Sequence, residues 1–233
     1  KESDTVDSFL FNATAVDSFG EPLTVTTEII DGEQFGGNTI TIQSSATDSK
    51  GNSNVITYTV RVYGLPVISD ASITSFKVED AITLTLLGIT AEDSFGQEIE
   101  DIKLELTDGE QKAGNVLTYL VTATDILGNI QTKTIGGIKI YGAPTITFNK
   151  EKTIMSVTDT IDALFLDAVA QDSFGAPLAV DVVLESGTLE GGNTVAFRLS
   201  VADMLGNIGE VVTQGIKVYS SDTISLTYNK AVS

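Results

Sequence analysis

The chain has 233 residues, 42% of them hydrophobic and 19% charged, so it can bury substantial cores and is not a disordered tail. Its 32 acidic residues against 13 basic ones leave a net charge of −19, which disfavours nucleic acid and anionic membranes as partners, because both require positive charge. The absence of Cys and His excludes disulfides, thiolate nucleophiles, Ser-His-Asp catalysis and histidine-ligated zinc.

The first part of the chain predicts short strands separated by turns. Apolar and polar residues alternate over 9–16, 22–30 and 55–63, and Ile40 and Ile42 alternate with threonines. A period of two with many β-branched residues is typical of half-buried strands. No run of about 18 apolar residues is present that could span a membrane.

The same alternation returns twice further along the chain. The predicted inward-facing side chains are Leu117, Tyr119, Val121 and Ala123 in the second stretch, and Val195, Phe197, Leu199 and Val201 in the third. The segment 158–172 is the nearest approach to an amphipathic helix, but its position ahead of the third "DSFG" motif predicts a strand.

Four landmarks recur along the chain at a spacing of 76 to 79 residues. They are the "DSFG" motifs at 17–20, 93–96 and 172–175, the Gly-Asn pairs at 37–38, 114–115 and 192–193, the D-x-x-G-N turns from Asp48, Asp125 and Asp203, and the strand ends at Tyr63, Tyr141 and Tyr219. A constant spacing over separate landmarks indicates an internal repeat. The sequence therefore predicts an all-β chain of three tandem β-sandwich modules, at 1–64, 65–142 and 143–220, with 221–233 as the first strand of a further module.

The order xATAVDSFGxPLTV…GGNTITIxSSATDxxGNSNxITYTVRV resembles the hyalin-type (HYR-like) and related bacterial immunoglobulin-like repeats. The resemblance extends over essentially the whole chain, three times. It implies immunoglobulin-like sandwiches, which serve many surface proteins as spacers or binding units. Hyalin-type repeats often carry a cysteine pair, and this chain has none, so core packing alone must hold each module.

Short junctions are expected between the modules. Two residues separate Tyr63 from Pro66, and two separate Tyr141 from Pro144. Because proline fixes φ and the connection has little slack, we expect a semi-rigid rod.

The sequence also allows a prediction about the two ends of the chain. The first repeat starts without the strand that opens the other two, and the tail "TISLTYNK" at 223–230 resembles "TITFNKEK" at 145–152. The chain is thus interpreted as an excerpt of a longer array, the alternative being a natural C-terminal extension. The tail is expected to pair with the first repeat of a neighbouring molecule, to lie against the third repeat, or not to pair at all.

Six aspartates begin the repeated turns: Asp17, Asp48, Asp93, Asp125, Asp172 and Asp203. In an immunoglobulin-type sandwich the two turns would be the B–C and F–G loops of one pole, close to the preceding junction. Carboxylates there could bind calcium, which takes six to eight oxygen ligands. Turn chemistry alone also explains Asp, Asn and Gly at these places, and another ligand is a third alternative.

Aromatic residues recur with the turns. Phe19, Phe95 and Phe174 of the "DSFG" motifs are expected either to cover the end of a sandwich or to be exposed contact residues. The tyrosines that end the last strand of each repeat are expected to pack at the next junction.

The leading functional hypothesis is a non-catalytic extracellular spacer or stalk of a bacterial cell-surface protein or adhesin, whose partners are the neighbouring modules of the array. The alternative is a ligand-binding module that contacts carbohydrate or a host protein, which would require one repeat with an exposed aromatic patch. An enzyme would require a convergent polar pocket, and no pair of acids stands out from the turn residues, so no catalytic activity is expected.

Overall fold

The computed structural model describes residues 1–7, 10–220 and 226–227. Over these residues the chain consists of short and medium strands, with a single four-residue helix, α1 (Leu84–Leu87). The prediction of an all-β fold is confirmed. The chain divides into two compact units, the first formed by Lys1–Ile73, Thr83–Thr107 and Thr118–Ile135 and the second by Thr74–Ile82, Asp108–Leu117 and Gly136–Ser233.

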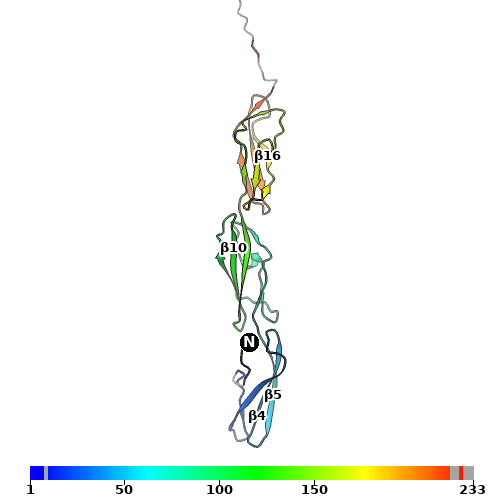
Figure 1. The fold of residues 1–233 in the computed structure, drawn as a ribbon, viewed down its shortest axis with the longest axis vertical. Coiled ribbons are helices and arrows are strands. Elements are labelled where there is room, and N and C mark those ends of the chain that lie inside the picture. The colour runs from blue at the N-terminus through cyan, green and yellow to red at the C-terminus, as the bar shows by residue number, and fades with distance from the viewer. Residues whose placement is uncertain (8–9, 221–225, 228–233) are drawn as a thin grey trace, which may run out of the picture. The chain divides into compact units, whose positions relative to one another are not determined.

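The first unit opens with one small and one larger antiparallel sheet. The larger sheet has the order β3-β4-β5, and Figure 1 shows β4 and β5 side by side. Its strands are β3 (Val25–Asp31), β4 (Thr39–Thr47) and β5 (Ser53–Arg61), and the small sheet pairs β1 (Ala15–Val16) with β2 (Pro22–Leu23). Ile40, Ile42 and Val62 are the buried residues of this core.

The second repeat has a four-stranded sheet of order β7-β11-β10-β9, in which β7 lies parallel to β11. A second, smaller sheet pairs β6 with β8. The bounds are β6 (Val67–Ile68), β7 (Ser75–Lys77), β8 (Ala91–Glu92), β9 (Ile102–Asp108), β10 (Val116–Thr124) and β11 (Ile130–Tyr141). These strands contribute residues to both compact units, so the three module boundaries given above stay a prediction.

The second unit contains the third repeat, a sandwich of two sheets. One sheet has the order β12-β14-β15 and the other β13-β19-β17-β16, with β18 also paired to β17. The bounds are β12 (Thr145–Thr147), β13 (Ile154–Ser156), β14 (Val169–Gln171), β15 (Pro177–Leu178), β16 (Asp181–Ser186), β17 (Thr194–Ala202), β18 (Ile208–Val212) and β19 (Ile216–Tyr219). Phe197 and Leu199 of β17 and Ile146 of β12 share one core, so the two sheets face each other.

The period-two prediction identified the core positions correctly. All eight predicted inward-facing residues of β10 and β17 are buried, and so are Ile40 and Ile42 of β4. Alternation works here because successive side chains of a strand point to opposite faces of the sheet.

Two predicted strands are wrong. In 158–172 only 169–171 form a strand, and residues 163–167 form turns instead; likewise residues 10–12 of the predicted strand 9–16 form a turn. The cause is an N-cap, because the Asp162 carboxylate accepts a hydrogen bond from the N–H of Phe165, 2.8 Å away.

The same capped turn occurs at the matching place in each repeat. The Oγ1 of Thr83 accepts from the N–H of Leu86 ahead of α1, and the carboxylate of Asp7 accepts from the N–H of Leu10. The turn then buries a leucine completely: Leu87 in the second repeat and Leu166 in the third. The segment is therefore a short turn, helical only in the second repeat, that fills the core and is not a strand.

The "DSFG" turns do not join two sheets as a B–C loop would. They close hairpins inside one sheet, between β1 and β2 and between β14 and β15. The D-x-x-G-N turns also close hairpins, as between β4 and β5. Among the described residues no helix is both long and apolar enough to cross a membrane.

Candidate functional site

The aspartate of each "DSFG" motif holds its own turn closed. Oδ1 of Asp17 accepts hydrogen bonds from the N–H groups of Phe19 and Glu21, both at 2.9 Å. Asp93 and Asp172 repeat this arrangement with the residues two and four positions later. This is the side-chain turn that Asp forms with its own backbone.

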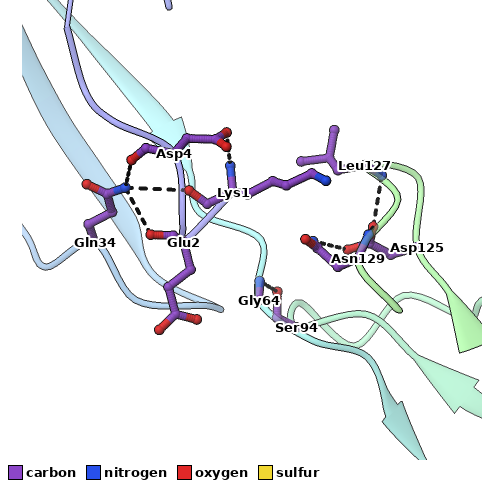
Figure 2. Close-up of polar contacts among 9 residues, drawn as sticks. All are labelled: Lys1, Glu2, Asp4, Gln34, Gly64, Ser94, Asp125, Leu127 and Asn129. Atoms are coloured by element: carbon purple, nitrogen blue, oxygen red, sulfur yellow. Dashed lines mark hydrogen bonds and ion pairs between the residues drawn. The ribbon is translucent and has the colours of Figure 1, made fainter. Parts of the chain in front are cut away.

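In the D-x-x-G-N turns the aspartate accepts three hydrogen bonds, one more than in the "DSFG" turns. Oδ1 of Asp125 accepts from the N–H groups of Leu127 and Asn129, and Oδ2 accepts from the side-chain amide of Asn129 at 2.7 Å, as Figure 2 shows. Gly128 has φ of +74°, which favours glycine at that step. Asp48 and Asp203 make the same three bonds with their own turns.

These bonds explain all six aspartates by local turn chemistry. In the first repeat Asp17 and Asp48 do line one common pocket. However, nowhere in the described parts of the chain do three or more Asp, Glu, Cys or His side chains gather as a metal-ion site would require. Calcium binding at these residues stays a prediction.

Replacing Asp125 distinguishes local turn chemistry from calcium binding. Asp125 is buried, so we expect Asp125→Ala to lower the free energy of unfolding by about 1–3 kcal/mol, since it strands two backbone N–H groups. Asp125→Asn keeps an acceptor and should lose less than half as much. Calorimetric melting with and without millimolar calcium is the measurement. A midpoint that rises with calcium in the parent chain but not in Asp125→Asn would establish a calcium site.

The hydrogen bonds of the exposed turn lower one pKa. The side-chain amide of Asn52, followed by the backbone N–H groups of Asn52 and Lys50, holds the pKa of Asp48 below its ordinary value of 3.8. A lowered native pKa contributes stability above pH 3.8 that is lost as the pH falls through the native pKa.

We expect Asn52→Ala to raise the pKa of Asp48 toward 3.8, because it removes the largest cause of the shift. An NMR titration of the Asp48 carboxyl carbon measures this. Asn54→Ala is the matched control, since the side chain of Asn54 bonds to Val55 and not to Asp48. Equal pKa values in the two variants would contradict the assignment.

The strongest repeated feature lies where one repeat follows another. Within the first unit the hydroxyl of Ser94 accepts a hydrogen bond from the N–H of Gly64 at 3.1 Å (Figure 2). The ring centroids of Tyr63 and Phe95 lie 5.0 Å apart in an edge-to-face arrangement. The guanidinium of Arg61 lies over the ring of Phe95, 5.2 Å from its centroid.

The second unit contains the same set of contacts. The N–H of Gly142 donates to the hydroxyl of Ser173 at 2.9 Å, and the rings of Tyr141 and Phe174 lie 4.8 Å apart. Lys139 places its ammonium 5.3 Å from the Phe174 centroid. We call each set a junction: the Tyr-Gly end of one repeat held against the Ser-Phe of the next repeat's "DSFG" turn.

Close backbone approach explains one glycine in each junction. A Cβ on Gly37 would lie 2.8 Å from the carbonyl oxygen of Ser94, and one on Gly114 would lie 2.9 Å from that of Ser173. Both glycines also have a positive φ, so any other residue there would be strained as well as crowded. In the first two Gly-Asn landmarks of the sequence, the glycine is thus a junction residue.

In the first two repeats a glutamine that the sequence did not single out supports the segment preceding the capped turn. The side-chain amide of Gln34 donates to the carbonyl oxygens of Lys1, Glu2 and Asp4, and Figure 2 shows all three bonds. Gln111 donates to Val78 and Asp80 in the same manner. The signal was available, since both glutamines lie four residues before the Asn of the Gly-Asn pair.

The repeated phenylalanines and tyrosines fall into two groups, packed and exposed. Phe95 and Phe174 are half-buried and each covers a tyrosine of the preceding repeat, so the predicted tyrosine packing at junctions is confirmed for Tyr63 and Tyr141. Phe19 and Tyr219 differ from these packed residues, because they are 90% and 58% exposed.

Comparisons with known proteins give no family. No family model matches the chain, and no curated protein matches it. Among solved structures it is similar to Protocadherin Gamma B2 extracellular cadherin domains 3–6, with 10% identity over 92% of this chain and 64% of that one and a TM-score of 0.28. It is also similar to the Protocadherin GammaB4 extracellular domain, with 10% identity over 93% and 47% of the two chains and a TM-score of 0.28. The chain thus spans less than two thirds of either structure, and a similarity at this level carries no argument about function.

Proposed function

We propose that the chain is a non-catalytic, semi-rigid spacer of tandem immunoglobulin-like modules in the extracellular or cell-wall part of a bacterial surface protein or adhesin. The observation that carries the proposal is the junction, which recurs with the same serine, phenylalanine, tyrosine and glycine in both units. A chain that served only as a set of independent binding modules would not require its connections to repeat. A spacer does require repeated connections, because the orientation of each module relative to the next must be fixed.

The junction contacts are strong enough to restrict a short linker. An aromatic pair contributes about 0.5–1.5 kcal/mol and an exposed cation over a ring about 0.5–1 kcal/mol. Together with the hydrogen bond to glycine, which contributes about 0.5–1.5 kcal/mol, these contacts stabilise each closed junction by about 1.5–4 kcal/mol. That favours the closed arrangement roughly tenfold to a thousandfold over a freely moving linker.

Small-angle scattering on the full chain tests the spacer. We expect Phe95→Ala and Phe174→Ala, together, to broaden the distribution of end-to-end dimensions while the strands stay folded, because both junctions lose their ring contacts. Phe35→Ala is the control, since Phe35 is 60% exposed and lies in neither ring pair. Unchanged scattering from the double variant would remove the support for a semi-rigid spacer.

The second candidate, binding of carbohydrate or a host protein, is supported by the unequal distribution of exposed aromatics. Phe19 and Phe35 are both exposed and both belong to the first repeat. Binding to immobilised glycans that is lost in Phe35→Ala, with scattering unchanged, would favour this function over the spacer.

A further inference from the structure

A groove lies at the second junction, between the end of the second repeat and the D-x-x-G-N turn of the third. Its volume is about 600 Å³. Residues 77–79 of the second repeat and residues 206–208 of the third line it, together with Gly142 of the linker. All of these residues belong to the second unit. The groove is thus a second region where these two repeats meet, in addition to the ring contact of Tyr141 with Phe174.

The linker contacts both sides of this groove closely. A Cβ on Gly209 of β18 would lie 2.3 Å from the carbonyl oxygen of Pro144, so a larger residue there would force β18 away from the linker. A Cβ on Gly142 would lie 3.6 Å from Cγ2 of Val78, which is ordinary van der Waals distance. The two walls of the groove are therefore joined by a short stretch of chain that packs against each of them.

The wall that carries Lys77 is fixed by its own hydrogen bonds. The backbone N–H of Lys77 donates to the carboxylate of Asp80 at 2.7 Å. The side-chain amide of Gln111 donates to the carbonyl oxygens of Val78 and Asp80. Lys77 ends β7 directly after the buried Phe76 and is half-buried itself. Because successive side chains of a strand point to opposite faces, the lysine is directed away from the core on a backbone that cannot easily move.

The turn on the other wall carries a buried negative charge. The carboxylate of Asp203, which is 8% exposed, accepts hydrogen bonds from the N–H groups of Leu205 and Asn207 and from the side-chain amide of Asn207. These donors are neutral, so the turn keeps the charge of the aspartate. Of the charged residues that line the groove, Glu79 is acidic as well and Lys77 is the cation. Attraction across the groove therefore depends on the ammonium of Lys77.

The first junction has the same residue type at the same place. Lys1 corresponds to Lys77, because each lysine lies three residues before the aspartate that accepts a hydrogen bond from its backbone nitrogen. Nζ of Lys1 lies 4.0 Å from the position that a Cβ on Gly128 would take. Figure 2 shows the lysine side chain directed at the D-x-x-G-N turn that begins at Asp125. In both units a lysine of one repeat thus lies beside the D-x-x-G-N turn of the next.

We propose that this lysine makes the stiffness of the spacer depend on ionic strength: the ammonium of Lys77 attracts the Asp203 turn of the following repeat and holds the second junction closed. The proposal rests on the spacer function proposed above and names what regulates it. Salt screens an attraction between partly exposed charges, whereas the ring contact of Tyr141 with Phe174 is not a charge pair. The junction therefore loosens as the salt concentration rises, but it does not lose its ring contact.

Distances between two spin labels test the proposal in the full chain. Because the chain has no cysteine, Glu110→Cys and Gln214→Cys place one label on each repeat, and both positions are exposed and belong to the second unit. We expect a narrow distance distribution in the labelled parent at low salt. Lys77→Met keeps the apolar stem and removes the charge, so it should raise the open fraction about 1.5- to fivefold, as loss of an exposed ion pair would. Lys77→Arg keeps the charge and should match the parent.

Lys217→Met is the matched control, since Lys217 is exposed and does not line the groove. Molar sodium chloride should broaden the distribution of the parent and leave that of Lys77→Met unchanged, because only the parent has an attraction to screen. Narrow and equal distributions in the parent and Lys77→Met would overturn the role of the lysine and leave the spacer intact. Equal broadening in Lys77→Met and Lys77→Arg would overturn it too, because lost packing and not lost charge would be the cause. A broad distribution in the parent at low salt would contradict the spacer itself.

Discussion

The variant Leu166→Ala is expected to lower the free energy of unfolding of the third repeat by about 3–5 kcal/mol. Leu166 is fully buried, and it packs in one core with Met155, Phe197 and Leu199. Truncation removes the apolar area that the leucine buries and also leaves a cavity that the two sheets cannot fill without moving. The loss is a large part of the stability expected for a domain of this size.

Leu164→Ala is a control two residues away in the same turn. Its side chain is 83% exposed, so its removal should change the free energy of unfolding by less than about 0.5 kcal/mol. Calorimetric melting of both variants compares a buried with an exposed leucine in the same turn. Similar losses in the two variants would show that the capped turn does not fill the core.

The second large effect is expected for Gly109→Ala, at the connection between β9 and β10. Gly109 has φ of +87°, and a Cβ there would lie 2.6 Å from the carbonyl oxygen of Val116 and 2.8 Å from Cδ2 of Leu117. The left-handed backbone costs an L-residue about 1–2 kcal/mol, and forcing the strand apart adds about 1–3 kcal/mol. We therefore expect a loss of about 2–5 kcal/mol.

Gly137→Ala separates the two contributions. Gly137 has φ of +78°, but a Cβ would meet nothing within 4 Å. This variant should show the backbone term alone, about 1–2 kcal/mol. Chemical denaturation followed by circular dichroism measures both variants. If Gly109→Ala were no worse than Gly137→Ala, the close approach to Val116 would have no energetic consequence. Gly32 and Gly187 occupy the same place in the other repeats, so the result should transfer to them.

The sequence alone was sufficient for the repeat, the all-β class and the inward faces of β10 and β17. These features depend on local periodicity and on landmarks spaced along the chain, and side chains of a strand alternate whatever they pack against. The six turn aspartates were also predictable, because each bonds to backbone within four residues of itself. Their hydrogen bonds need no information from a distant segment.

Only the tertiary structure showed what depends on residues far apart. The segments around Asp7 and Asp162 have apolar patterns compatible with a strand or a short helix. Each forms a turn, which is capped by the aspartate, and the second of these turns places Leu166 in the core. The partner of Phe95 is Tyr63, 32 residues earlier and in another repeat, so no local pattern could reveal the pair. The cleft beside Ala15 is likewise lined by residues that lie between Phe11 and Tyr58 in the sequence, so it is a property of the assembled sheets and not of any segment by itself.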